Sequence, residues 1–392
     1  MADFQAFMIA LCVAAAIYPF LAARRFRPRY ESSRDDPLPS HAENQARFDR
    51  GRSGRVSTRL VWLTLAIAFL IRWSRSSDDG VGHDPNLPYF IVAVGLFCAS
   101  LIGATLDRYR WETGFASRNP RLGESVQPLS LRLWAAALVA IPLLLIVVAM
   151  AVRSLEWSIG LGIAAFAALV VRQKVLLAAL ARSRKEVAPD SPLALGLTEM
   201  SHAYAIQPKR FLLIPAMIAN GWALPDGTIM LTSALREIAT DEEIVAILAH
   251  EFSHAKDGDA RRLQRANGIA VGGVCGLLLG AVVVPQISLT PILMPTLILT
   301  LVVSIQLARL PVLAFSRRLE HKCDAEAAKR GYGPSLASGL DKLHRYMGLP
   351  LTWGSLDEPF LTHPSLYDRL ARIARIGAGD PPAPVPDEAS RI

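Results

Sequence analysis

Charged residues are scarce in this sequence: they make up 19% of its 392 residues, whereas hydrophobic residues make up 52%. A soluble domain of this length would carry more charge, so the composition predicts a membrane protein. Cysteine is also rare, and the four cysteines have neither the spacing of a disulfide framework nor that of a cysteine zinc site. No basic residue precedes the first apolar run, and Arg24 and Arg25 follow it, which is the reverse of a cleavable signal peptide.

Seven apolar runs are candidates for membrane spans, each of which takes about twenty mostly apolar residues. These runs are residues 4–23, 60–71, 88–106, 131–152, 157–180, 268–284 and 291–313. The run 60–71 is short, but seven spans with an outside N-terminus put every basic connecting segment in the cytoplasm, as the positive-inside rule requires. Because the basic residues mostly flank apolar runs, the net charge of +8 indicates membrane anchoring and no nucleic-acid partner.

The sequence His250-Glu251-Phe252-Ser253-His254 has the H-E-x-x-H pattern and follows a stretch of helical periodicity. On a helix, residues i and i+4 lie one above the other, so His250 and His254 present two imidazoles to one point. This geometry suits two zinc ligands, and Glu251 lies near enough to accept a proton from water. The pattern therefore predicts a zinc site with one Zn²⁺ per chain. The alternative is a surface helix with two unrelated histidines.

A catalytic zinc usually takes three protein ligands and leaves one position for water. Glu320 and Asp324 stand at i and i+4 of a predicted helix over 317–330, so Glu320 could bind metal while Asp324 accepts the free N–H of a ligating histidine. On spacing alone, a solvated face that pairs with arginines is slightly favoured. Cys323 could offer a thiolate but is better explained as a buried structural cysteine.

Four motifs together resemble the HtpX heat-shock protease and CaaX prenyl endopeptidase family, which are membrane-embedded zinc metalloproteases. The motifs are Asn220…Ala223, His250-Glu251-x-x-His254, Glu320-x-x-x-Asp324 and His363-Pro364-Ser365. The resemblance implies that Glu320 is the third ligand and Glu251 the general base. It also implies substrate- or oxyanion-contacting roles for Asn220, Ala223, His363 and Arg369. From the residues alone, Thr362 to Ser365 reads as a loop before a helix, with Pro in its first turn.

Between the fifth and sixth runs, the pattern predicts a helix at 192–203, a strand at 211–215 and a hairpin at 220–232 with a Pro-Asp-Gly turn. The hairpin edge at 220–224 could pair with an extended substrate. A break at 331–334 precedes a further helix at 335–347. The polar segment 24–59, rich in Arg and Pro, is expected to be a loop.

The predicted fold is a mainly α polytopic membrane protein with a gluzincin-type α+β zinc-protease domain split around a transmembrane helical hairpin. Its parts are residues 1–185 (five spans), 186–264 (first protease part), 265–315 (hairpin), 316–376 (second protease part) and 377–392 (disordered tail). We expect an endopeptidase that acts on peptide or membrane-protein substrates in quality control or processing. Arg exceeds Lys, which is typical of a GC-rich bacterial genome, so we expect the lipid bilayer of a bacterial inner membrane, with the catalytic domain facing the cytoplasm.

Two other functions fit the same residues less well. A zinc-binding polytopic scaffold or transporter would not need Glu251, and a structural zinc site tends to be closed by four ligands. A site-2 type intramembrane protease would carry its aspartate motif after the histidines, whereas Leu224-Pro225-Asp226-Gly227 precedes them.

Overall fold

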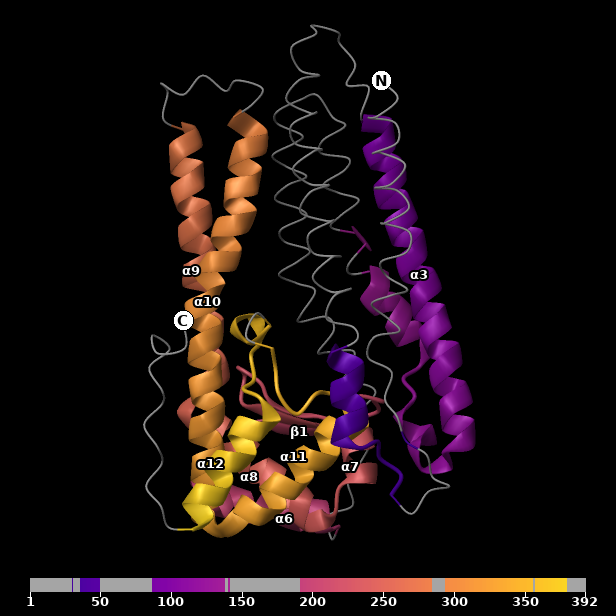
Figure 1. Cartoon of the computed structure of the whole chain (residues 1–392), viewed down its shortest axis with the longest axis vertical. Coiled ribbons are helices and arrows are strands. Elements are labelled where there is room, and N and C mark those ends of the chain that lie inside the picture. The colour runs from indigo at the N-terminus through magenta and orange to yellow at the C-terminus, as the bar shows by residue number, and fades with distance from the viewer. Residues whose placement is uncertain are drawn as a thin grey trace, which may run out of the picture.

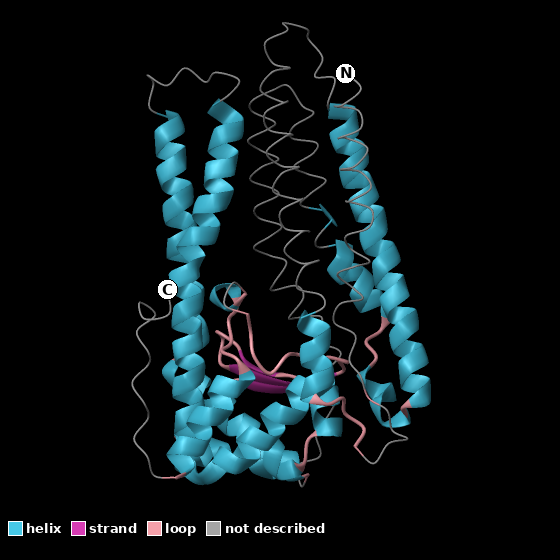
Figure 2. Cartoon of the chain, in the orientation of Figure 1, coloured by secondary structure: helices cyan, strands magenta, loops and turns pink. Residues whose placement is uncertain are grey.

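The computed structural model describes residues 30, 36–49, 87–137, 140–141, 191–283, 293–354 and 357–378 (Figure 1). This part of the chain is mainly helical and has one small sheet, which confirms that the fold is mainly α (Figure 2). Its elements are α3 (Leu87–Arg118), η1 (Pro120–Ser125), α6 (Pro192–Tyr204), β1 (Arg210–Ile214), β2 (Gly221–Ala223), β3 (Thr228–Thr232), α7 (Ser233–Ile238), α8 (Asp241–Asp257), α9 (Asp259–Val283), α10 (Leu293–Ala327), η2 (Ala328–Tyr332), α11 (Gly333–Met347), η3 (Glu358–Phe360) and α12 (Leu366–Gly377).

The sheet has the strand order β1-β3-β2, in which β3 pairs with β1 in parallel and with β2 antiparallel. The predicted hairpin is confirmed, because β2 and β3 are joined through Pro225, Asp226 and Gly227. Asp226 Oδ1 accepts a hydrogen bond of 3.1 Å from the backbone N–H of Thr228, and Gly227 supplies the positive φ of 84°. All of β3 is buried, and it lies between the other two strands. β2 therefore forms one edge of the sheet.

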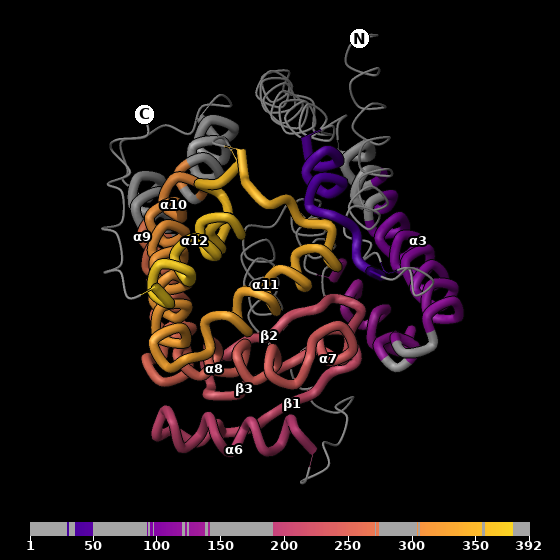
Figure 3. Tube along the Cα trace, turned by 60° about the horizontal axis from the view of Figure 1, so that its bottom comes forward, coloured from indigo at the N-terminus to yellow at the C-terminus, as the bar shows by residue number. Residues whose placement is uncertain are grey.

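Helix α8 has strong end signals in its sequence. Thr240 and Glu243 form a reciprocal capping box at its N-terminus, and Gly258 takes the left-handed conformation at its C-terminus. The residues from Ile244 to Ser253 include a long buried face that packs between α6 and α11 (Figure 3). The site-bearing end of α8 is therefore fixed from both sides.

Helices α3, α9 and α10 extend in one direction from a compact body that holds the sheet, α6, α8, α11 and α12 (Figure 1). The predicted runs at 88–106, 268–284 and 291–313 lie on these three helices, and the other four runs lie wholly or mostly outside the described residues. Among the described residues, no helix combines the length and the hydropathy that a membrane crossing requires. The expected disordered tail also lies almost entirely outside the described residues.

The break predicted at 331–334 is confirmed: Gly331 has a φ of 92°, and α11 begins at Gly333. The expectation of a loop over 24–59 is wrong for residues 41–49, which form a helix. The signal for this helix is a capping box. Glu43 N donates to Ser40 Oγ over 3.2 Å, and Ser40 N donates to Glu43 Oε2 over 2.9 Å.

Candidate metal centre

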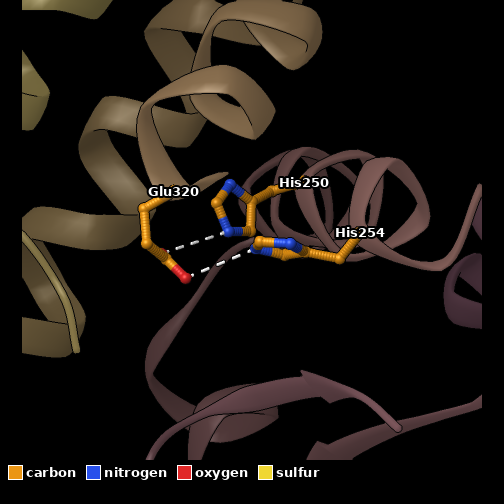
Figure 4. A group of neighbouring side chains, drawn as sticks. All are labelled: His250, His254 and Glu320. Carbon is orange, nitrogen blue, oxygen red and sulfur yellow. Dashed lines mark ion pairs between the residues drawn. The ribbon is translucent and has the colours of Figure 1, made fainter. Parts of the chain in front are cut away.

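Two histidines of α8 and one glutamate of α10 converge at the point where these helices pack together (Figure 4). His250 Nε2 lies 3.6 Å from Glu320 Oε2, and His254 Nε2 lies 3.4 Å from Glu320 Oε1. His250 and Glu320 are buried, with 5% and 6% of their surfaces exposed, and His254 is half-buried. The helix brings the two imidazoles to one side, as the i, i+4 spacing requires, and α10 brings the carboxylate to meet them.

The donor set has the chemistry and the spacing of a zinc site. Zinc binds imidazole nitrogen and carboxylate oxygen, and tetrahedral bonds of about 2.0–2.2 Å separate neighbouring donor atoms by roughly 3.3–3.6 Å. His250 Nε2 and His254 Nε2 lie 3.6 Å and 3.4 Å from different oxygens of Glu320, and one ligand atom from each of the three residues lies within 4.8 Å of the other two. These residues therefore fit a zinc ion.

Asp324 lies behind His250, on the side away from Glu320. Its Oδ1 is 2.9 Å from His250 Nδ1, an ion-pair distance, although the two groups are not aligned for a hydrogen bond. The guanidinium of Arg369 donates from Nε and Nη2 to the two oxygens of Asp324, over 2.8 Å and 2.7 Å, and its Nη1 lies 3.5 Å from Glu320 Oε2. Burial alone would raise the pKa of Asp324, but Arg369 outweighs burial and holds that pKa well below its usual value. The site is thus supported by a fully charged pair, and the expected substrate contact of Arg369 stays a prediction.

Asp259 is a buried partner of His254 to which the sequence analysis gave no role. Its Oδ2 lies 3.2 Å from His254 Nδ1 and 2.7 Å from Lys322 Nζ, and Lys322 Nζ also donates to Asp257 over 2.7 Å. The signal in the sequence is Gly258, because a left-handed glycine ends α8 and turns the next residue back toward the helix. Each histidine therefore has a carboxylate beside Nδ1 while its Nε2 faces Glu320.

Cys323 also lies beside His254 Nδ1, at 3.3 Å, and it is fully buried. It belongs with His254 and Asp259 to a second group of possible ligand atoms, on the side of the imidazole opposite to Glu320. Lys322 already occupies this side with its ammonium group. This arrangement fits the interpretation of Cys323 as a buried structural cysteine.

The charges of the cluster shift its pKa values strongly. Burial would lower the pKa of His250, but Asp324 and Glu320 outweigh burial and raise it to about 9. Burial is likewise outweighed at His254, where Asp259, Cys323 and Glu320 raise the pKa. At Glu320, burial would raise the pKa, but His363 and the two other histidines hold it well below its usual value. A metal ion would therefore have to displace protons from the imidazoles.

A cavity of about 410 Å³ opens onto the cluster. Eight of the nine predicted site residues line it, and the ninth is Asp324; the eight are Asn220, Ala223, His250, Glu251, His254, Glu320, His363 and Arg369. His363 is 56% exposed at its side chain, and its Nδ1 lies 3.0 Å from Glu320 Oε2. Glu251 is 8% exposed and packs against β2, where a Cβ added at Gly221 would lie 3.3 Å from Glu251 Cγ. Strand β2, the Glu251 side chain and the three candidate ligands thus line the same cavity.

The carboxylates behind the histidines give a prediction about metal affinity. Asp259→Ala and Asp324→Ala should each weaken zinc binding about 10–100-fold, because each removes the carboxylate that lies beside Nδ1 of a ligating imidazole. Asp257→Ala is the matched control, since Asp257 contacts Lys322 and is 38% exposed at its side chain. Competition with a zinc chelator measures all three affinities. If Asp257→Ala weakens binding as much as Asp259→Ala, the effect comes from Lys322 and not from the imidazole.

Comparisons with known proteins relate this geometry to one family. Residues 196–376 match the model of peptidase family M48. The chain is similar to protease HtpX of Stutzerimonas stutzeri (strain A1501), with 26% identity over 205 residues that cover 46% of this chain and 70% of the relative. It is also similar to a protease HtpX homolog of Campylobacter concisus (strain 13826), with 29% identity over 199 residues that cover 42% of this chain and 65% of the relative.

A solved structure has a related fold. The crystal structure of S. mikatae Ste24p aligns with a TM-score of 0.51 and covers 94% of this chain and 98% of its own. The identity is 15%, so this likeness concerns the fold alone. The family match includes α8 with both histidines as well as the part of α10 that carries Glu320.

Proposed function

Because the chain is a metalloprotease of peptidase family M48, of the type that includes the HtpX proteases, we propose that it is a zinc endopeptidase whose centre is His250, His254 and Glu320. The observation that carries this proposal is the convergence of the three ligand atoms on one wall of a cavity that Glu251 also lines. A purely structural zinc site would need neither the cavity nor Glu251.

Each residue of the site has a role in peptide hydrolysis. His250, His254 and Glu320 would hold the zinc ion, and Asp324 and Asp259 lie beside Nδ1 of the two imidazoles. When bound, zinc supplies Lewis acidity, which polarises a carbonyl and makes water more acidic. Glu251 accepts the proton of the attacking water and passes it to the leaving amine as the C–N bond breaks. His363 lies beside Glu320 and is exposed to the cavity, where it can donate a hydrogen bond to the oxyanion.

Strand β2 is the element that suits an extended substrate. Its pairing with β3 leaves its other side without a strand partner among the described residues, and its residues Gly221, Trp222 and Ala223 line the cavity. A peptide added along this edge would lie across Glu251, which packs directly against Gly221. Asn220 enters β2 with its Oδ1 bonded to Gly221 N over 3.0 Å, so its side chain also supports the start of the edge.

We assign the enzyme to the lipid bilayer, with seven spans, and we expect the catalytic domain to face the cytoplasm of a bacterial cell. The sequence supports this topology through its apolar runs and through the basic segments that alternate with them. Quality control or processing of membrane proteins is the role that suits such a location.

Cysteines engineered at Asp79 and Ser288 should react with an impermeant thiol reagent in intact cells, and one at Ser183 should not. Labelling at Ser183 would contradict the orientation.

Purified protein incubated with a peptide library tests the activity itself. New amino termini at internal bonds, read by mass spectrometry, are the expected products of an endopeptidase. Zinc-loaded protein that cleaves no peptide, in detergent and in vesicles, would contradict the proposal.

A further inference from the structure

The cavity has a wall that the catalytic residues do not supply. After α11 ends, residues 349–354 run along the cavity, and Leu349 and Trp353 line it together with His250 and Glu251. Trp353 is half-buried, so part of its indole is available to a ligand. A bulky side chain that lines a cavity limits the size of the group that the cavity admits.

The helix of residues 41–49 holds this wall from the outside. The rings of Phe48 and Trp353 meet edge to face, with centroids 5.6 Å apart and an interplanar angle of 65°. One residue earlier, the backbone N–H of Thr352 donates to Gln45 Oε1 over 3.3 Å. The side chain and the backbone of the wall are therefore both fixed by one short helix, which lies near the end of α11 (Figures 1 and 3).

The rest of this segment is anchored on α11 itself. Asn44 is fully buried, and its Nδ2 donates to the carbonyl oxygen of Arg345 over 3.2 Å. Arg345 in turn donates to the carbonyl oxygens of Pro39 and Leu38, over 2.9 Å and 3.0 Å, and it pairs with Asp36. A segment some 300 residues away in sequence is thus bound by specific polar contacts to α11, whose residues His344 and Met347 line the cavity.

Packing alone does not account for tryptophan at this position. The indole Nε1 of Trp353 is buried and has no hydrogen-bond acceptor among the described residues. A buried donor without a partner costs about 1–3 kcal/mol, and phenylalanine would contact Phe48 without that cost.

We propose that Trp353 determines the size of the substrate side chain that the cavity accepts, and that residues 36–49 position Trp353 for this role. The proposal rests on the proposed peptidase activity. It makes substrate selection depend on the segment that precedes the second apolar run, and it defines Trp353 as a specificity residue and Phe48 as a positioning residue.

The test compares two peptides that differ only in having Ala or Phe at one position next to the cleaved bond. Trp353→Ala should raise the Phe-to-Ala ratio of kcat/KM about tenfold or more, because it removes a steric limit in an apolar cavity. Phe48→Ala should shift the ratio in the same direction by roughly three- to tenfold, the value of one aromatic pair. Phe48→Trp, which keeps the edge-to-face contact, should restore the ratio. Ala46→Ser, on the exposed side of the same helix, should leave it unchanged.

Zinc content should be the same in all these variants. If Trp353→Ala and Phe48→Ala change kcat/KM by the same factor for both peptides, the proposal is contradicted. An equal Phe-to-Ala ratio in Phe48→Ala and Ala46→Ser would also contradict it. Binding of the same peptide pair to the Glu251→Gln form gives a second ratio that does not depend on turnover. Absence of any cleavage by the wild type would contradict the peptidase proposal. If adding Trp353→Ala to the Glu251→Gln form leaves the ratio of the two binding affinities unchanged, only the role of Trp353 is contradicted.

Discussion

Glu251→Gln is expected to lower the rate of peptide cleavage roughly 10²–10⁴-fold or more, because the substitution removes the base that accepts the proton of water. Zinc should stay bound, since His250, His254 and Glu320 are unchanged and glutamine has nearly the same shape as glutamate. The buried position of Glu251 against Gly221 keeps the substituted side chain facing the cavity. Loss of rate without loss of metal is the expected pattern for a base.

Glu242→Gln is the matched control for this experiment. Glu242 lies on the same helix, nine residues earlier, and it is exposed to solvent. The same change of charge should therefore leave the rate at the wild-type value. Single-turnover cleavage and metal analysis of the two purified variants measure the difference. Wild-type cleavage by zinc-loaded Glu251→Gln would show that Glu251 is not the base.

Glu320→Ala is expected to abolish cleavage and to weaken zinc binding by more than the 10–100-fold expected for a supporting carboxylate. The substitution removes one of three protein ligands and leaves His363 and Arg369 beside an empty position in a buried site. Glu320→Gln tests the same ligand with less loss of packing. Circular dichroism of the metal-free variants checks that α10 still folds.

Glu326→Ala is the control on the same helix. Glu326 bonds Arg330 over 3.0 Å and 2.9 Å, and it lies outside both groups of possible ligand atoms. Zinc content and rate should stay at the wild-type values in this variant. If Glu320→Ala keeps full zinc while Glu326→Ala or Cys323→Ala loses it, the assignment of Glu320 is wrong.

Local signals in the sequence predicted the parts of the site that lie on one helix. The spacing of His250 and His254 is a property of α8 alone, because helical geometry places residues i and i+4 on one side whatever the helix packs against. The β2–β3 hairpin was predictable for the same reason, because its turn residues set the register.

Contacts between distant elements were not predictable from local pattern. Nothing in the spacing of Glu320 and Asp324 distinguishes a site from a solvated face, and only the family resemblance pointed to Glu320. The pairing of Arg369 with Asp324 depends on how α12 packs against α10. The partnership of Asp259 with His254 depends on the direction that the chain takes after Gly258.

The helix at 41–49 illustrates a different limit. Its capping box was present in the sequence as Ser40-x-x-Glu43, but the surrounding Arg and Pro content favoured a loop. Its stability comes from docking on α11 and on the wall that carries Trp353, which no local pattern encodes. Short helices of this kind form mainly through tertiary contacts.

Titration of the metal-free protein with zinc, followed by the rate of peptide cleavage, tests most directly whether His250, His254 and Glu320 form a catalytic centre. The rate should be absent without metal, should rise in proportion to added zinc and should stop rising at one equivalent per chain. Cleavage that persists after metal removal, or that is unchanged when His254 is replaced by Ala, would contradict a zinc peptidase at this site.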